Sequence, residues 1–275
     1  MILLKNIIGF SHEAEQPLTA PEAVPVPVSV PRKSVVQVFF PARPMTLAYY
    51  NDRFDLQVGD LVYVNGKLEG LIGKVVQVNY SFRIRRSDYK EVIAKIDTDV
   101  RGTLLLAGSH FVTFDPTVIP AEKVLRWVKA PSDFSEEEEI IGLDDNLRIS
   151  LEHPDPERIR PEIAERGNDY YRENRVLYFC LNGTSGHAIV EGSRIYEVDF
   201  RYENGEICDP ICDCYCSGVC KHIVAALLQL RETLDFVREN YADVPHEGNY
   251  LAAIRKNTLF SFAFEGKTKG GFTLL

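Results

Sequence analysis

The stretch Cys212-Asp213-Cys214-Tyr215-Cys216-Ser217-Gly218-Val219-Cys220-Lys221-His222 decides the fold of the second half of this chain. Disulfide scaffolds usually spread their cysteines to close long loops, whereas metal sites cluster them as here. Alternate side chains of an extended segment lie on one side, so a Cys-x-Cys pair can present two sulfurs to one ion. Cys220 and His222 would complete a tetrahedron where a helix begins. Because four protein ligands close the site, the stretch predicts one structural zinc ion.

The spacing alone leaves the ligand set open. Cys212 with Cys214, and Cys214 with Cys216, are both valid Cys-x-Cys pairs. The expected helix N-terminus places a partial positive charge beside the thiolates in either case. The two cysteines outside the stretch, Cys180 and Cys208, fall in strand patterns and are predicted to be buried apolar residues.

A wider pattern surrounds this stretch over residues 161–232. It consists of Arg166-Gly167, Tyr170-Tyr171, Arg175-Val176, Ala188-Ile189-Val190-Glu191-Gly192-Ser193, Tyr196-Glu197-Val198, Gly205-Glu206-Ile207, Cys212-Asp213-Cys214 and Cys220-Lys221-His222-Ile223-Val224-Ala225. This pattern resembles the SWIM zinc-finger family. The zinc ligands that the resemblance implies are Cys212, Cys214, Cys220 and His222, with Cys216 as the alternate ligand. In the family the first ligand usually falls about five residues after the isoleucine of Gly-x-Ile, and counting from Ile207 gives Cys212. The resemblance also implies DNA or protein binding beside helicase, transposase or signalling modules.

The first half of the chain has the pattern of a β protein. The β-branched and aromatic runs at 35–40, 61–64, 73–78 and 91–96 alternate with turn residues, which suggests a small, strongly bent barrel. Residues 35–78 contain a second pattern. It consists of Val36-Gln37-Val38-Phe39-Phe40-Pro41, Leu47-Ala48-Tyr49-Tyr50, Leu56-Gln57-Val58-Gly59-Asp60-Leu61-Val62-Tyr63-Val64 and Ile72-Gly73-Lys74-Val75-Val76. This pattern is similar to the N-terminal DNA-binding domain of primosomal replication-restart helicases. The expected fold class is therefore α+β, with a β-barrel-like module before the zinc finger.

The formal net charge of −9 is unevenly distributed along the sequence. Residues 33–131 carry 14 basic and 10 acidic groups, net +4, whereas 132–160 carry 3 and 10, net −7, and 161–232 carry 7 and 12, net −5. The base-rich part of the first region is 79–90, where arginines alternate with aromatic residues that could stack on bases. The nucleic-acid-binding residues predicted from it are Arg83, Arg85, Arg86, Lys90, Tyr80 and Phe82. The alternative is a solvated hairpin tip whose aromatic side chains fold back on the barrel.

These patterns divide the chain into five parts. They are an N-terminal segment with a Pro-rich linker (1–32), the basic β module (33–131), an acidic linker (132–160), the zinc module (161–232) and a helical and β extension (233–275). The acidic linker is either a solvated connection or a surface for a basic partner. A short helix is expected to start at Pro161 and to end at Gly167, and a last strand is expected at 259–264.

The motifs that are absent from the sequence favour a binding protein over an enzyme. It contains no His-Glu-x-x-His, no Cys-x-x-Cys, no deaminase pattern and no phosphate loop. No run of 18 apolar residues and no export signal occur, so we expect a cytoplasmic protein that does not bind membranes. The isolated histidines His110, His153 and His246 are predicted to be surface or capping residues.

Three functional hypotheses follow from the sequence. The first is a zinc-binding, non-enzymatic adaptor that binds DNA or RNA through the basic β module and a helicase or another protein through the zinc module. The second is a protein-interaction scaffold with a structural zinc ion and no nucleic-acid binding. The third, a thiol-based redox or zinc enzyme, requires a reactive cysteine.

Overall fold

The structure of this protein is a computed structural model that describes residues 30–131, 147–151, 159–244, 248–264 and 271–275. The part from Pro31 to Leu275 is one compact unit. Its mixture of helices and two sheets confirms the α+β class. Nearly all of the predicted N-terminal segment, 1–32, and most of the predicted acidic linker, 132–160, lie outside the described residues, as do His153 and His246.

The smaller sheet contains the strands that the β-branched runs predict. Its members are β1 (Ser34–Phe40), β2 (Met45–Asn51), β3 (Leu61–Val64), β4 (Gly73–Asn79) and β5 (Val92–Lys95), in the order β2-β1-β4-β3-β5. Register shifts at Gln37/Val38 and Tyr63/Val64 bend the sheet, as bulges do. The bend does not produce a closed barrel, because the edge strands β2 and β5 are not paired as strands and only the Tyr50–Glu91 bridge links this side of the described sheet.

The larger sheet has nine strands and draws on residues far apart in the sequence. They are β6 (Gly102–Ala107), β7 (His110–Thr113), β8 (Arg148–Ser150), β9 (Val176–Asn182), β10 (Ser185–Glu191), β11 (Ile195–Glu203), β12 (Glu206–Cys212), β13 (Tyr250–Arg255) and β14 (Phe272–Leu274), in the order β14-β6-β7-β13-β9-β10-β11-β12-β8. All neighbours are antiparallel except β14 and β6. β6 and β7 thus join the sheet of the zinc module, although the sequence groups them with the basic β module.

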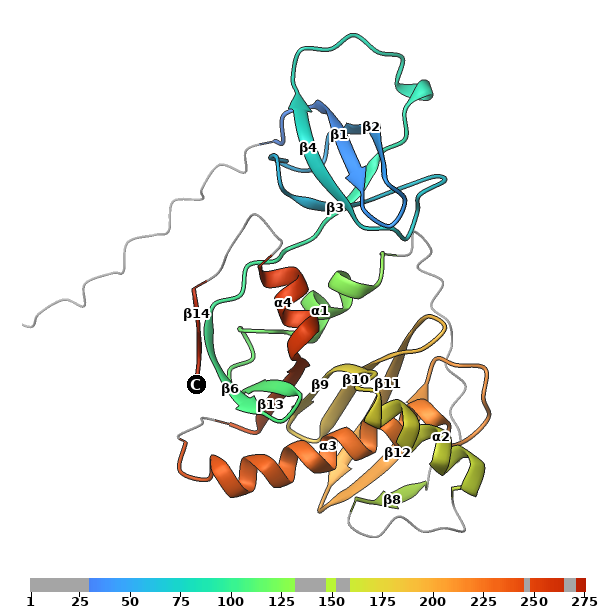
Figure 1. The fold of residues 1–275 in the computed structure, drawn as a ribbon, viewed down its shortest axis with the longest axis vertical. Coiled ribbons are helices and arrows are strands. Elements are labelled where there is room, and N and C mark those ends of the chain that lie inside the picture. The colour runs from blue at the N-terminus through green and yellow to red at the C-terminus, as the bar shows by residue number, and fades with distance from the viewer. Residues whose placement is uncertain (1–29, 132–146, 152–158, 245–247, 265–270) are drawn as a thin grey trace, which may run out of the picture. The chain divides into compact units, whose positions relative to one another are not determined.

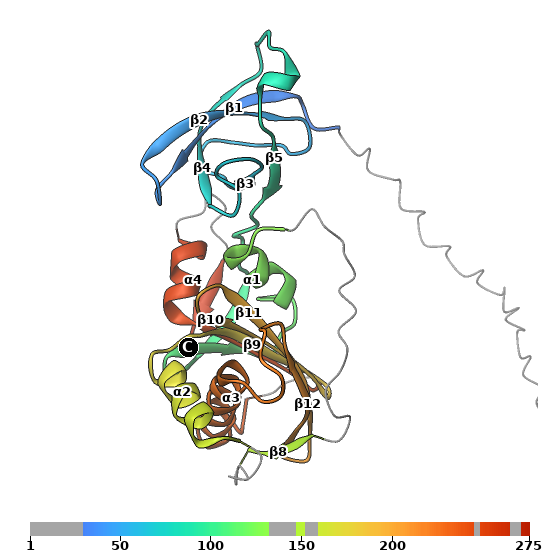
Figure 2. The same ribbon diagram turned by 90° about the vertical axis from the view of Figure 1, so that its right-hand side faces the viewer.

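Two helix layers cover the larger sheet (Figures 1 and 2). The helices are α1 (Ala121–Val128), α2 (Pro161–Arg172), α3 (Lys221–Asn240) and α4 (Lys256–Ala263), with a short 3-10 turn η1 (Arg86–Asp88) after β4. α2 and α3 pack on one face around a core that includes Phe179, Val198 and Leu230. α1 and α4 pack on the other face around a core that includes Trp127 and Tyr178. These layers hold the end of β12 against the start of α3.

Two helices differ from the sequence expectation. Residues 259–264 are largely helical, in α4, and do not form the expected last strand, because Leu259 and Ala263, four residues apart, face the core. Helix α2 continues through Gly167 to Arg172 instead of ending there. A Cβ atom at Gly167 would lie 2.4 Å from Cβ of Val224. Gly167 therefore permits the close approach of α2 and α3 and is not a helix cap.

Trp127 joins the two sheets. Its indole Nε1 donates a hydrogen bond to the Asp97 carbonyl at 2.6 Å, and its ring stacks on Phe262 with a centroid distance of 5.2 Å. Its own carbonyl oxygen accepts a hydrogen bond from the Tyr63 hydroxyl at 3.3 Å, and Tyr63 belongs to the smaller sheet. The same core contains Tyr178 of the larger sheet. One hydrophobic core thus continues from one sheet into the other.

His110 is buried, which corrects the prediction of a surface or capping residue. Its Nε2 donates a hydrogen bond to the Val176 carbonyl at 2.8 Å, so Nδ1 accepts from the Ser109 hydroxyl at 2.9 Å. The pKa of His110 is lowered from its ordinary value of 6.5 to about 4. Burial is the main cause, the positive charges of Arg255 and Lys256 act in the same direction, and the hydrogen bond to Val176 opposes the shift. The imidazole is therefore neutral at pH 7.

This lowered pKa predicts a loss of stability in mild acid. The unfolded chain takes up a proton on His110 below pH 6.5, whereas the folded protein does so only below about pH 4. The stabilising contribution is full above pH 6.5 and is lost as the pH falls toward 4. Between pH 7 and pH 5 we expect this residue to remove about 2 kcal/mol from the free energy of unfolding.

Urea unfolding of the wild type and of His110→Gln at pH 7 and pH 5 measures this contribution. The difference in free energy of unfolding between the two proteins should shrink by about 2 kcal/mol at pH 5, because glutamine does not titrate. An imidazole signal of His110 that titrates near pH 6.5 in the folded protein would contradict the prediction.

Candidate metal centre

The Cys/His cluster is built where strand β12 passes into helix α3. Cys212 is the last residue of β12 and pairs with Val198 of β11. The chain then turns through Gly218, whose φ of +80° favours glycine. Cys220 is the N-cap of α3, and His222 lies in the first turn of that helix. The end of β12, the bend after it and the start of α3 thus carry the four residues that the family resemblance names as ligands.

Four side chains converge at this junction. The ligand atoms of Cys212, Cys214, Cys220 and His222 all lie within 4.8 Å of one another, which is close enough to hold a metal ion. His222 Nδ1 is 3.6 Å from the Cys212 sulfur and 3.8 Å from the Cys220 sulfur. Cys220 is 0% exposed and His222 is 3% exposed. Cys216, the alternate ligand, is exposed and outside this group.

Aromatic rings fix the orientation of His222. The ring of Tyr196 stacks on the imidazole with centroids 3.9 Å apart and an interplanar angle of 19°, and Tyr170 lies on it at 5.5 Å. A Cβ atom at Gly192 would lie 2.7 Å from the Tyr196 ring and 3.4 Å from His222 Nε2. Gly192 therefore leaves room for the stack. His222 Nε2 is buried and has no hydrogen-bond partner among the described residues, so Nδ1 is the nitrogen presented to the sulfurs.

The three thiols share their protons unequally. A hydrogen bond from Cys212, supported by His222 and the Ile223 amide against the effect of burial, lowers the pKa of Cys220 to about 4. The same bond, together with burial, raises the pKa of Cys212, and burial raises the pKa of Cys214 to about 11. A cation bound by all three sulfurs must displace the protons of Cys212 and Cys214. Its affinity therefore falls as the pH falls.

The predicted nucleic-acid residues lie in the segment between β4 and β5, and three of them already contact the protein. Arg86 forms an ion pair with Glu91 at 2.8 Å and lies 3.5 Å from Asp52. The Phe82 ring meets the edge of Tyr50, with centroids 6.3 Å apart. Arg86 and Phe82 thus hold the segment on the sheet. The position of Phe82 agrees with the alternative prediction, in which the aromatic side chains fold back on the barrel.

The third is Tyr80, which pairs with a residue that sequence reasoning missed. The Arg32 guanidinium lies over the Tyr80 ring, 4.4 Å from its centroid. No sequence signal indicates Arg32, because its contact depends on the register of β1 on β4, where Val35 is opposite Asn79. Arg83, Arg85 and Lys90 are exposed, and none of them forms an ion pair within the described part of the chain.

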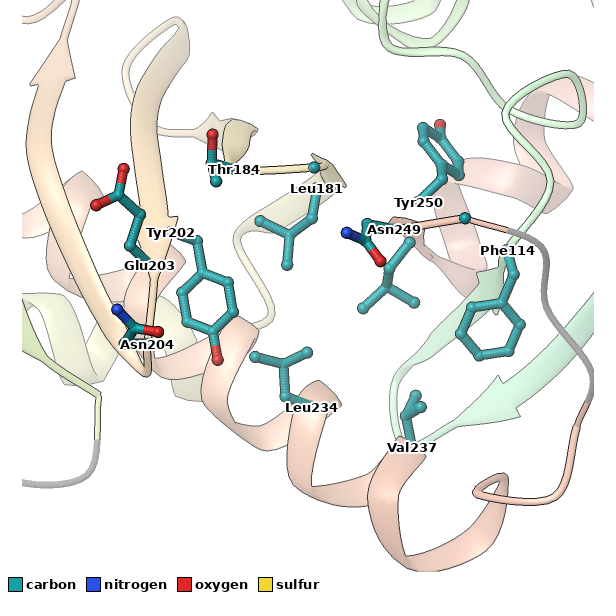
Figure 3. A pocket seen from close by; sticks show the side chains of 13 residues that line it. Phe114, Leu181, Thr184, Tyr202, Glu203, Asn204, Leu234, Val237, Asn249 and Tyr250 are labelled. Carbon is teal, nitrogen blue, oxygen red and sulfur yellow. The ribbon is translucent and has the colours of Figure 1, made fainter.

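A separate cleft of about 630 Å³ lies on the α3 side of the larger sheet (Figure 3). Leu181, Leu234 and the ring of Tyr202 point toward its centre, while the Glu203 carboxylate points away from it. Glu203 is ion-paired with Arg201 at 2.9 Å. The cleft brings together the β9–β10 and β11–β12 turns, the start of β13 and helix α3, and no sequence motif indicates it. Its described lining has an apolar floor and no cluster of titratable groups.

Comparisons with known proteins identify no relative of this chain. No protein-family model, no curated protein and no solved structure matches the chain. In the described residues, no helix combines the length and the apolar character needed to cross a membrane.

Proposed function

We propose that Cys212, Cys214, Cys220 and His222 bind one structural zinc ion. The observation that carries this proposal is the convergence of three sulfurs and one imidazole nitrogen in a largely buried site. A tetrahedral zinc ion with Zn–S of about 2.3 Å and Zn–N of about 2.1 Å holds sulfur and nitrogen about 3.6 Å apart, close to the two sulfur–nitrogen distances here. Metal analysis of the purified protein should give one zinc ion per chain.

The surroundings of the site support a SWIM-type zinc finger over 161–232. Gly192 and Tyr196, both part of the family pattern, pack on His222. Ile207, from the Gly-x-Ile landmark, is buried in the core that α3 covers. These residues thus have structural roles around the cluster, as landmarks of one zinc-binding unit would.

The proposed role of this protein is that of an adaptor and not of an enzyme. Four protein ligands leave a zinc ion no open position for substrate or water, so the ion stabilises the fold. Reduced thiols are required for this site, which fits a cytoplasmic location.

A helicase or another protein is the proposed partner of the zinc module, and Tyr215 supports such a contact. Its side chain is fully exposed in the metal loop, the segment 213–220 between β12 and α3. Tyrosine is enriched at protein interfaces.

Nucleic acid, with DNA tested first, is the proposed ligand of the basic β module. Arg83, Arg85 and Lys90 extend from the segment between β4 and β5 without a carboxylate partner in the described chain, so their charges are available to phosphates. Tyr80, from the same segment, holds the Arg32 guanidinium over its ring. If the full-length protein bound neither DNA nor RNA at low salt, the scaffold function without nucleic-acid binding would replace this part of the proposal.

The arginines should differ in their effect on DNA binding. We expect Arg83→Ala with Arg85→Ala to weaken DNA binding at low salt at least tenfold and to reduce the slope of log K against log salt by about 2. Arg86→Ala is the matched control, because Arg86 is already paired with Glu91 and should change the affinity much less. Fluorescence anisotropy over a series of salt concentrations measures both quantities. Equal losses in the two variants would contradict the assignment.

A further inference from the structure

Asp213 stands between the ligands Cys212 and Cys214 and is held by the neighbouring strand. Its backbone N–H donates to the Glu197 carbonyl at 3.1 Å. Its carboxylate Oδ1 in turn accepts the Glu197 backbone N–H at 2.9 Å. These two bonds extend the β11–β12 ladder by one residue, into the metal loop. The position of Asp213, between Cys212 and Cys214, is therefore fixed relative to Glu197 of β11.

Two cations hold the same carboxylate from other elements. Arg194 lies 3.5 Å from Asp213 Oδ2 and also donates a hydrogen bond to the Asp213 carbonyl. Lys129, which follows α1, donates to the Glu197 carboxylate at 2.5 Å and lies 3.9 Å from Asp213 Oδ2. We call Lys129, Arg194, Glu197 and Asp213 the Asp213 clamp. It joins residues up to 84 positions apart, from Lys129 to Asp213, at the metal loop.

We propose that the Asp213 clamp positions Cys212 and Cys214 for metal binding. This inference rests on the proposed metal site. Cys214 lies in a turn outside any strand or helix, so its sulfur is fixed by what holds the residues beside it. The clamp holds Asp213, the residue before Cys214. It does so through the hydrogen bonds between Asp213 and Glu197 and through two cations at the Asp213 carboxylate. These residues act through the ligands and are positioning residues.

The charges of the clamp also suit a thiolate-rich site. Three thiolates, a divalent ion and a neutral imidazole carry a net charge of −1, and Asp213 adds a further negative charge beside them. Lys129 and Arg194 offset this charge. An isolated surface ion pair contributes little, but Asp213 and Glu197 are only 27% and 24% exposed and share a network. Mutation of residues that support metal ligands typically lowers metal affinity by about 10- to 100-fold.

The test uses the full-length protein and four variants. Lys129→Met removes the cation, Lys129→Arg restores it, and Asp213→Ala removes the carboxylate. Lys123→Met is the matched control, because Lys123 lies on α1, the helix that Lys129 follows, and pairs with Asp97, away from the cluster. Competition with a chelator gives the zinc dissociation constant, and the visible spectrum of the Co²⁺-loaded protein reports the tetrahedral geometry. Urea unfolding of the metal-free proteins measures the stability of each fold separately.

We expect zinc affinity to fall roughly tenfold in Lys129→Met and up to roughly 100-fold in Asp213→Ala. The Co²⁺ spectrum should change in Asp213→Ala, and Lys129→Arg should recover most of the affinity. Unchanged zinc affinity in both Lys129→Met and Asp213→Ala would overturn the proposal, as would an equal loss in Lys123→Met. A wild-type protein that binds no metal would instead refute the proposed function. The two failures are thus distinguishable.

Discussion

Cys220→Ser is expected to abolish metal binding and to lower the free energy of unfolding by about 5 kcal/mol or more. Cys220 is 0% exposed and lies at the N-cap of α3, so its loss removes one ligand from the buried junction between β12 and the helix that covers the larger sheet. The three remaining ligands would be left close together without the ion that offsets their charge. Removal of the metal with a chelator should have a similar effect on the wild type.

Metal content and urea unfolding of Cys220→Ser are the measurements. Cys216→Ser is the matched control, because Cys216 is exposed on the same loop and lies outside the cluster. It should keep one metal ion and unfold at the wild-type urea concentration. Loss of metal in Cys216→Ser together with its retention in Cys212→Ser would show that the alternate ligand is the true one.

Trp127→Ala is expected to lower the free energy of unfolding by about 4 kcal/mol. The side chain is fully buried, stacks on Phe262 and donates to the Asp97 carbonyl, so alanine leaves a cavity and an unpaired acceptor. Because Tyr63 and Tyr178 belong to different sheets but share this core, both sheets should lose stability together.

Circular dichroism during urea unfolding measures this effect, since Trp127 is the only tryptophan and fluorescence would be lost with it. Tyr63→Phe is the control. It removes only the hydroxyl group that donates to the Trp127 carbonyl and should cost about 1 kcal/mol. Two separate transitions in the wild type, with only one of them affected by Trp127→Ala, would contradict a shared core.

The parts of the fold that local sequence determines were predictable. The alternation of β1 and the ligand spacing at the start of α3 depend on residues close together in the chain, and so does proline at the first turn of α2. The four converging ligands are those that the family resemblance implies. Its landmark spacing favoured Cys212, whereas the Cys-x-Cys rule alone accepted Cys216 equally.

The features that were missed depend on contacts between distant residues. The burial of His110 follows from its pairing with Val176, and the role of Gly167 follows from its approach to Val224. Arg86 looked equivalent to Arg83 and Arg85, because nothing in the sequence shows that Glu91 and Asp52 fold beside it. The Asp213 clamp is missed for the same reason. Local patterns carry no information about which charges meet in the folded chain.

The place of β13 in the larger sheet sets an order of events during synthesis. Residues 250–255 form a central strand between β7 and β9, although both of those strands leave the ribosome much earlier. The cysteines and histidine of the metal site are also translated before β13. A metal ion could therefore bind at the Cys/His cluster while the edges of β7 and β9 are still open to wrong partners.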